Sequence, residues 1–142
     1  MSVRRTLPQR ARSMVGAWCF LDNYGSDDLS ASAGMQVPPR PQTGLQTVSW
    51  LFAGEVLHHD SLGSVAMVRP GELNLMSAGH GISHSEQSPS DRSPLLHGAQ
   101  LCVALPDGAP ALENHVDLPD IDIDVDGATV RVSLGELAGA RS

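Results

Sequence analysis

Short apolar runs separated by turn residues dominate this sequence. Residues 47–52 alternate polar and apolar side chains before becoming wholly apolar, which is typical of a strand entering a buried region. The same pattern predicts further strands at residues 55–60, 65–68, 73–76 and 95–105. Pro70-Gly71 fits a type II turn between two of them. With 14 Gly and 10 Pro marking many turns, the sequence predicts an all-β sandwich or barrel.

The two ends of the chain carry weaker patterns. Residues 14–22 form an apolar run of strand length, so we expect Trp18, Phe20 or both to enter the core. Residues 23–36 lack periodicity and are predicted to be a loop. Near the C-terminus, residues 121–126 alternate strictly and residues 129–132 pair back as a hairpin. Its acidic row, Asp122, Asp124 and Asp126, is interpreted as a solvated face, with calcium binding as the alternative.

Size and charge restrict the classes of function. A chain of 142 residues suits one domain, and a net charge of −7 without any lysine argues against direct nucleic-acid binding. No apolar run is long enough to span a membrane, and the N-terminus lacks the apolar segment of a signal peptide. Cys19 and Cys102 are interpreted as reduced thiols. We therefore expect a cytoplasmic protein without a membrane partner.

The candidate chemistry lies in two pairs of side chains with i, i+2 spacing. His84 and Glu86 follow a Gly-His-Gly segment, and in a strand their side chains lie on one face. Arg40 and Gln42 share the same spacing in an earlier segment and should also face one way. A histidine and a carboxylate in one cavity supply half of a metal site.

These motifs resemble the pirin family of the cupin superfamily. The family motif places His-Pro-His where this chain has Arg40-Pro41-Gln42, and Gly-Ile-x-His-x-Glu where it has residues 81–86. The resemblance covers residues 4–120 and implies a cupin barrel, that is, a double-stranded β-helix or jelly roll. It also implies that residues 1–142 are a single cupin domain, either a natural single-cupin protein or the N-terminal half of a bicupin.

In pirins the matching positions resemble a four-ligand iron site, of which this chain keeps His84 and Glu86. The permanent positive charge of Arg40 opposes the binding of a metal ion nearby, and the Gln42 side chain offers only a weak amide-oxygen ligand. We therefore expect either no metal or weakly bound Fe(II) or another divalent ion, with His80 and His58 as candidate recruits. For charge balance, Arg40 is predicted to pair with Glu86 and Gln42 to hydrogen-bond His84.

The remaining histidines are given other roles. We favour a hydrogen-bonding role for His58, and His59 should face the opposite side of its strand. His97 and His115 are interpreted as structural or exposed.

Three functions follow from the resemblance and the altered motif. The first is a metal-poor binding or regulatory protein, whose partner is a small molecule in the barrel or another protein. The second is an iron-dependent dioxygenase of the quercetinase type. The third is a metal-free enzyme in which Arg40, His84 and Glu86 are catalytic, with Arg40 binding an anion and the other two moving protons. The sequence leaves the oligomeric state open.

Overall fold

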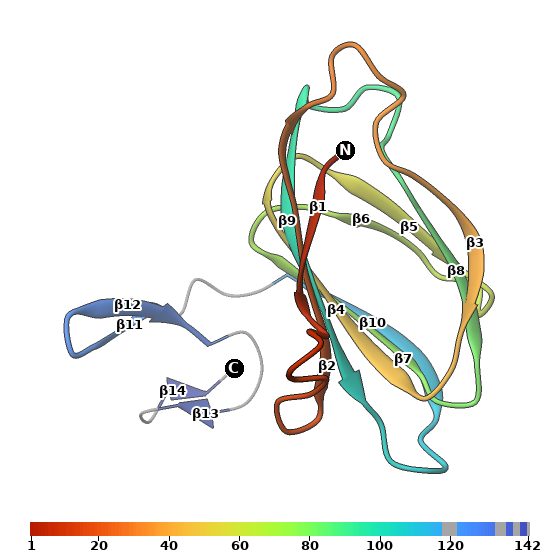
Figure 1. The fold of residues 1–142 in the computed structure, drawn as a ribbon. Coiled ribbons are helices and arrows are strands. Elements are labelled where there is room, and N and C mark those ends of the chain that lie inside the picture. Colours follow the sequence, from red (N-terminus) through yellow and green to blue (C-terminus); the bar gives the residue numbers. More distant parts are fainter. Residues whose placement is uncertain (118–121, 133–135, 138–139, 142) are drawn as a thin grey trace.

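The fold is built from two antiparallel sheets (Figure 1). The computed structural model describes residues 1–117, 122–132, 136–137 and 140–141. In spatial order, the six-stranded sheet contains β1 (Val3–Leu7), β2 (Trp18–Asp28), β9 (Leu95–Ala104), β4 (Leu45–Ala53), β7 (Glu72–Ala78) and β10 (Ala111–Asp117). The four-stranded sheet contains β3 (Gln36–Gln42), β8 (Ile82–Gln87), β5 (Val56–Asp60) and β6 (Val65–Val68). The predicted all-β barrel is confirmed.

Two small hairpins follow the barrel strands along the chain and stand beside the barrel in Figure 1. They are β11 (Asp122–Val125) with β12 (Ala128–Arg131), and β13 (Glu136–Leu137) with β14 (Ala140–Arg141). The first was predicted from the alternating tail. The part of the chain that is described contains no helix long and apolar enough to cross a membrane.

The interior has a polar part and an apolar part, and strand β4 contributes to both. Its buried positions alternate as Thr47, Ser49 and Leu51, as expected for a strand with one inward face. Leu51 belongs to the main apolar cluster, which also contains Tyr24, Leu29, Met35, Val56, Val68 and Leu96. Thr47 and Ser49 instead face polar partners. The polar part of the interior is where the candidate site lies.

Strand β2 differs from the prediction. Trp18 is 42% exposed and Phe20 is only half-buried, with the Arg5 guanidinium 4.8 Å from its ring centre, so neither side chain forms the core. The strand instead continues to Asp28, through residues predicted to be a loop. Tyr24 explains the difference, because it is buried and lies opposite Gly98 in β9. Pairing with β9 overrides the absence of local periodicity.

The predicted turns form as expected. Gly71 has a φ of 88°, the left-handed value that a type II turn requires of its third residue. Asp126 and Gly127, with φ of 53° and 81°, form the tight turn of the tail hairpin. Asp124 and Asp126 are exposed, in agreement with a solvated face, whereas the Asp122 side chain lies outside the described residues.

Gly98 generates a first prediction about stability. A Cβ at this position would lie 2.6 Å from Tyr24 Oη and 2.8 Å from Leu51 Cδ2, inside the packed core. We expect Gly98→Ala to lower the free energy of unfolding by about 1–3 kcal/mol through overpacking, measured by urea denaturation. Adding Tyr24→Phe removes the nearest atom and should recover part of the loss. A Gly98→Ala variant as stable as the wild type would contradict this account of the core.

Candidate functional site

A cavity of about 180 Å³ lies beside strands β3 and β9. Arg40 and Gln42 both line it, which confirms that they face the same way. Gln100 and Cys102 contribute from β9, and Arg5, Phe20 and Asp22 from β1 and β2. Arg40 is exposed, so solvent reaches its end of the cavity.

The carboxylate of Glu86 is held by the opposite sheet. Glu86 is 7% exposed, and its Oε1 accepts a hydrogen bond of 2.9 Å from Gln100 Nε2. Gln100 Nε2 also donates to Ser49 Oγ at 3.2 Å. Sequence reasoning gave Gln100 no role, although it lies in the strand predicted at residues 95–105 and in a segment, residues 97–101, that resembles a pirin motif. This chain of hydrogen bonds joins the two sheets across the interior.

The predicted ion pair between Arg40 and Glu86 is wrong. Among the described residues Arg40 forms no ion pair with any carboxylate. The β3–β8 register gives the reason, because Val37 lies opposite Glu86, Arg40 lies opposite His84, and the register shifts between Val37 and Arg40. Gln100 takes the place predicted for the guanidinium.

The predicted hydrogen bond between Gln42 and His84 is also wrong. Gln42 lies opposite Ile82, and its Nε2 donates to Thr47 Oγ1 at 2.6 Å. Thr47 Oγ1 in turn lies 3.6 Å from Cys102 Sγ, within the range of a weak hydrogen bond to sulfur. The Gln42 amide is therefore already hydrogen-bonded to Thr47 on β4, which in turn contacts Cys102 on β9.

His84 is held as a neutral imidazole. It is 2% exposed and stacks on His58, with ring centres 5.9 Å apart and planes 16° from parallel. Neither ring nitrogen of His84 has a hydrogen-bond partner. Burial, followed by the positive charge of Arg40, lowers the pKa of His84 to about 4, although Asp60 acts in the opposite direction. At neutral pH the uncharged ring can therefore donate one hydrogen bond and accept another.

His58 and Asp60 extend this buried group, but the predicted hydrogen-bonding role of His58 is wrong. His58 Nε2 lies 3.6 Å from Asp60 Oδ2, too far for a hydrogen bond, and both side chains are almost completely buried. Sequence reasoning missed Asp60, although its i, i+2 spacing from His58 on β5 was a usable signal.

Of the other histidines, His59 lines a small surface pocket together with Asp60 and His84. His59 is exposed, as predicted, and His80 is exposed in the turn between β7 and β8. His97 packs against Phe52, with ring centres 4.8 Å apart. The His115 side chain lies outside the described residues.

The residues at the four motif positions do not fit a divalent-metal centre. His84 supplies an unpartnered nitrogen, but Glu86 already accepts a hydrogen bond from Gln100 and Gln42 is bonded to Thr47. Arg40 brings a permanent positive charge instead of a lone pair. Within the described ranges, no three His, Cys, Asp or Glu side chains are grouped closely enough to hold a metal ion.

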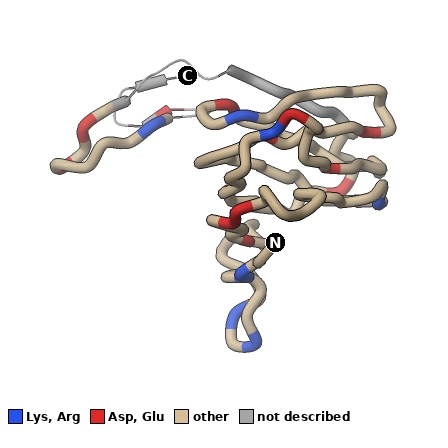
Figure 2. Tube along the Cα trace, turned by 90° about the horizontal axis from the view of Figure 1, so that it is seen from above, with Lys and Arg blue, Asp and Glu red and all other residues tan. Residues whose placement is uncertain are grey.

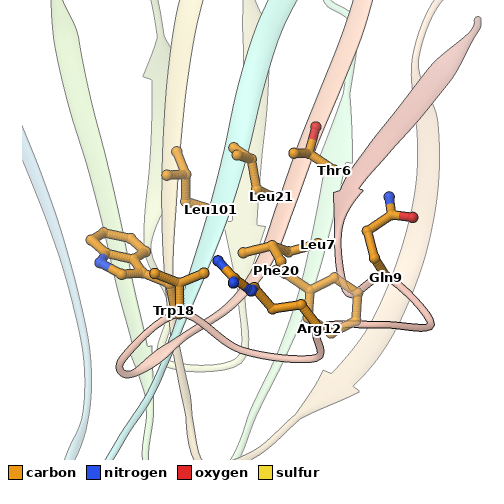
Figure 3. A pocket seen from close by; sticks show the side chains of 9 residues that line it. Thr6, Leu7, Gln9, Arg12, Trp18, Phe20, Leu21 and Leu101 are labelled. Atoms are coloured by element: carbon orange, nitrogen blue, oxygen red, sulfur yellow. The ribbon is translucent and has the colours of Figure 1, made fainter.

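A larger apolar groove, of about 520 Å³, lies along β1 and β2 near the loop that joins them (Figure 3). Arginines gather on this projecting loop, as the blue segments in Figure 2 show. The groove is lined by Thr6, Gln9 and Arg12 and mainly by apolar side chains: Leu7, Val15, Trp18, Phe20, Leu21 and Leu101. It contains neither His84 nor Glu86.

Comparisons with known proteins identify the relatives of this chain. The Pirin family model matches residues 1–103. The chain is 47% identical to "Putative quercetin 2,3-dioxygenase PA1205" of Pseudomonas aeruginosa, over 100% of the chain and 45% of that protein. It is 37% identical to human Pirin over 74% of the chain and 37% of that protein.

Solved structures agree with these sequence relatives. A quercetin 2,3-dioxygenase structure from Acinetobacter baumannii superposes with a TM-score of 0.89 and 43% identity, covering 99% of this chain and 47% of that one. A bacterial pirin from Escherichia coli, solved in complex with nickel(II), gives a TM-score of 0.66 and 25% identity over 81% of this chain and 50% of that one. The chain spans about half the length of the relatives it matches. It belongs to the pirin family, and its barrel is of the cupin type.

Proposed function

We propose that this chain is a metal-poor pirin-type cupin that acts as a binding or regulatory protein. The carrying observation is that Arg40 and Gln42 occupy the motif positions at the cavity, while Glu86 is already hydrogen-bonded to Gln100. This donor set disfavours a divalent cation and leaves a polar pocket. The prediction that residues 1–142 form a single cupin domain belongs to this proposal.

A small molecule in the barrel is the partner that we favour over another protein. Gln42 and Gln100, which are hydrogen-bonded to Thr47 and Glu86, both line the cavity, and a concave polar site of this kind suits a small molecule. We also propose a cytoplasmic location, because Cys19 and Cys102 are both free thiols, as a reducing compartment would keep them.

Two observations favour a second candidate, a metal-dependent dioxygenase of the quercetinase type. Relatives of this chain carry the quercetin 2,3-dioxygenase name, and the E. coli pirin structure contains nickel(II). In this chain the unpartnered ring nitrogens of His84 are the groups that such an ion would use. A metal would supply a Lewis acid for a substrate hydroxyl.

The catalytic roles of Arg40, His84 and Glu86 remain a third proposal. A neutral His84 has a free ring nitrogen that can accept a proton from a bound substrate, and Arg40 can stabilise the anion that results, which supports acid–base chemistry without a metal. Glu86 accepts a hydrogen bond from Gln100 instead of pairing with Arg40, so one of its oxygens is already engaged by the protein.

Metal content is the direct test of the main proposal. We expect protein purified without chelator to contain less than roughly 0.1 metal ion per chain by elemental analysis, since the site has too few donors. Arg40→His combined with Gln42→His should raise this to about one Fe(II) or Ni(II) per chain, because it restores two imidazoles. Arg10→His, on the exposed loop, is the matched control and should bind no more than the wild type. Wild-type protein that retains near-stoichiometric metal would overturn the proposal.

The ionisation of His84 gives a prediction that does not depend on ligand. We expect its NMR titration to give a pKa of about 4. Because this value lies below the ordinary 6.5, the folded state binds fewer protons than the unfolded state, and the free energy of unfolding falls as pH drops from about 6.5 to about 4. Arg40→Gln removes one of the causes and should raise the pKa, whereas Arg10→Gln should not. Titration of wild-type His84 near 6.5 would contradict the buried, neutral assignment.

Quercetin-dependent oxygen uptake separates the second candidate from the first. After loading with Fe(II), Ni(II) or Co(II), we expect the wild type to consume oxygen no faster than the metal alone in buffer. The double variant with two restored imidazoles should gain uptake if the pocket still admits quercetin. Sustained turnover by the wild type with any of these metals would establish the dioxygenase and remove the metal-poor interpretation.

A further inference from the structure

We propose that Arg40 anchors a small monocarboxylate in the cavity it shares with Phe20 and Leu45. This inference rests on the proposed metal-poor function and names the chemical class of its ligand. Where the family motif has a metal-ligating histidine, this chain presents a guanidinium, which recognises a carboxylate through two parallel hydrogen bonds.

The positive charge of Arg40 is not compensated within the described residues. Asp22, the carboxylate that lines the same cavity, is already paired with Arg5 through Nε to Oδ1 at 2.9 Å and Nη2 to Oδ2 at 2.8 Å. Glu86 accepts from Gln100 and forms no ion pair. The charged side chains that line the cavity therefore leave one excess positive charge, and it lies on Arg40.

The positive charge of Arg40 also acts on two groups in the interior, His84 and Cys102. It lowers the pKa of buried His84, after the larger effect of burial, and it acts in the same direction on Cys102. Burial nevertheless raises the pKa of Cys102 overall, so its thiol is neutral. The charge of Arg40 therefore acts on neutral groups of the interior, and Arg5, the other cation that lines the cavity, is already paired with Asp22.

The other walls restrict the rest of the ligand. Phe20 and Leu45 give an apolar surface, and Gln100 has donated its amide hydrogens to Glu86 and Ser49. A volume of about 180 Å³ limits the ligand to a small body. Because Arg5 already neutralises Asp22, the one excess positive charge of the lining matches a single negative charge on the ligand. These features select a monocarboxylate with a compact apolar group over phosphate, sulfate or a dicarboxylate.

Benzoate is a suitable probe, with benzamide as its neutral counterpart. We expect the intact protein, in the presence of chelator, to bind benzoate saturably by isothermal titration calorimetry and benzamide at least roughly tenfold more weakly, because charge-assisted hydrogen bonds are lost. Inorganic phosphate and sulfate should not compete. Arg40→Gln should weaken benzoate binding at least tenfold by the same argument. Since Arg40 is exposed and forms no ion pair with any described residue, this variant should retain the wild-type melting temperature.

Two further variants distinguish binding in the cavity from nonspecific ion pairing with surface arginines. Arg10→Gln removes an exposed arginine outside the cavity and should leave benzoate affinity unchanged. Leu45→Trp fills the cavity without altering charge and should weaken binding as Arg40→Gln does. Equal affinity for benzoate and benzamide, or affinity unchanged in either Arg40→Gln or Leu45→Trp, would overturn the proposal.

The metal measurement keeps the two proposals apart. Stoichiometric metal in the wild type, together with Arg40-dependent benzoate binding under chelator, would refute only the metal-poor function. Metal-free protein that does not bind benzoate would refute only the ligand class.

Discussion

A buried carboxylate must have a hydrogen-bond partner, and the way Glu86 meets this requirement determines much of the site. A carboxylate moved from water into a protein interior loses favourable hydration unless polar groups replace it. Here the replacement is the amide of Gln100, which comes from the facing sheet and is itself bonded to Ser49. The contact links β8 to β9 and β4, so it organises the cavity as well as satisfying one charge.

The hydrogen bond from Gln100 to Glu86 has an electrostatic consequence for Arg40. Because Gln100 is neutral, the Glu86 carboxylate is solvated without being paired, and the guanidinium across the site is left with its full charge. Asp22 does not compensate it, because Arg5 holds both carboxylate oxygens. The site thus has a buried carboxylate at Glu86, an exposed guanidinium at Arg40, and a buried, neutral His84 opposite Arg40 in the strand register. Such an arrangement suits binding of a small anion better than coordination of a second cation.

The stacked pair of His84 and His58 leaves several buried polar atoms unsatisfied. Among the described residues, their ring nitrogens, one oxygen of Asp60 and Asn74 Oδ1 are buried without hydrogen bonds, whereas Thr47 and Gln100 are bonded to Gln42 and Ser49. Buried polar groups of this kind cost stability and are commonly associated with function. The histidine pair lies on β5 and β8, within the four-stranded sheet that also carries Arg40.

The sequence by itself determined the all-β architecture, because alternation in residues 47–52 and turn residues such as Gly71 act over a few neighbouring positions. It also determined that His84 and Glu86 are buried strand residues and that Arg40 and Gln42 face one cavity. Only the tertiary structure decided the partners. The register shift between Val37 and Arg40 placed Arg40 opposite His84, and the facing sheet supplied Gln100 for Glu86. Strand register and contact between sheets depend on residues far apart in the chain, so local spacing does not encode them.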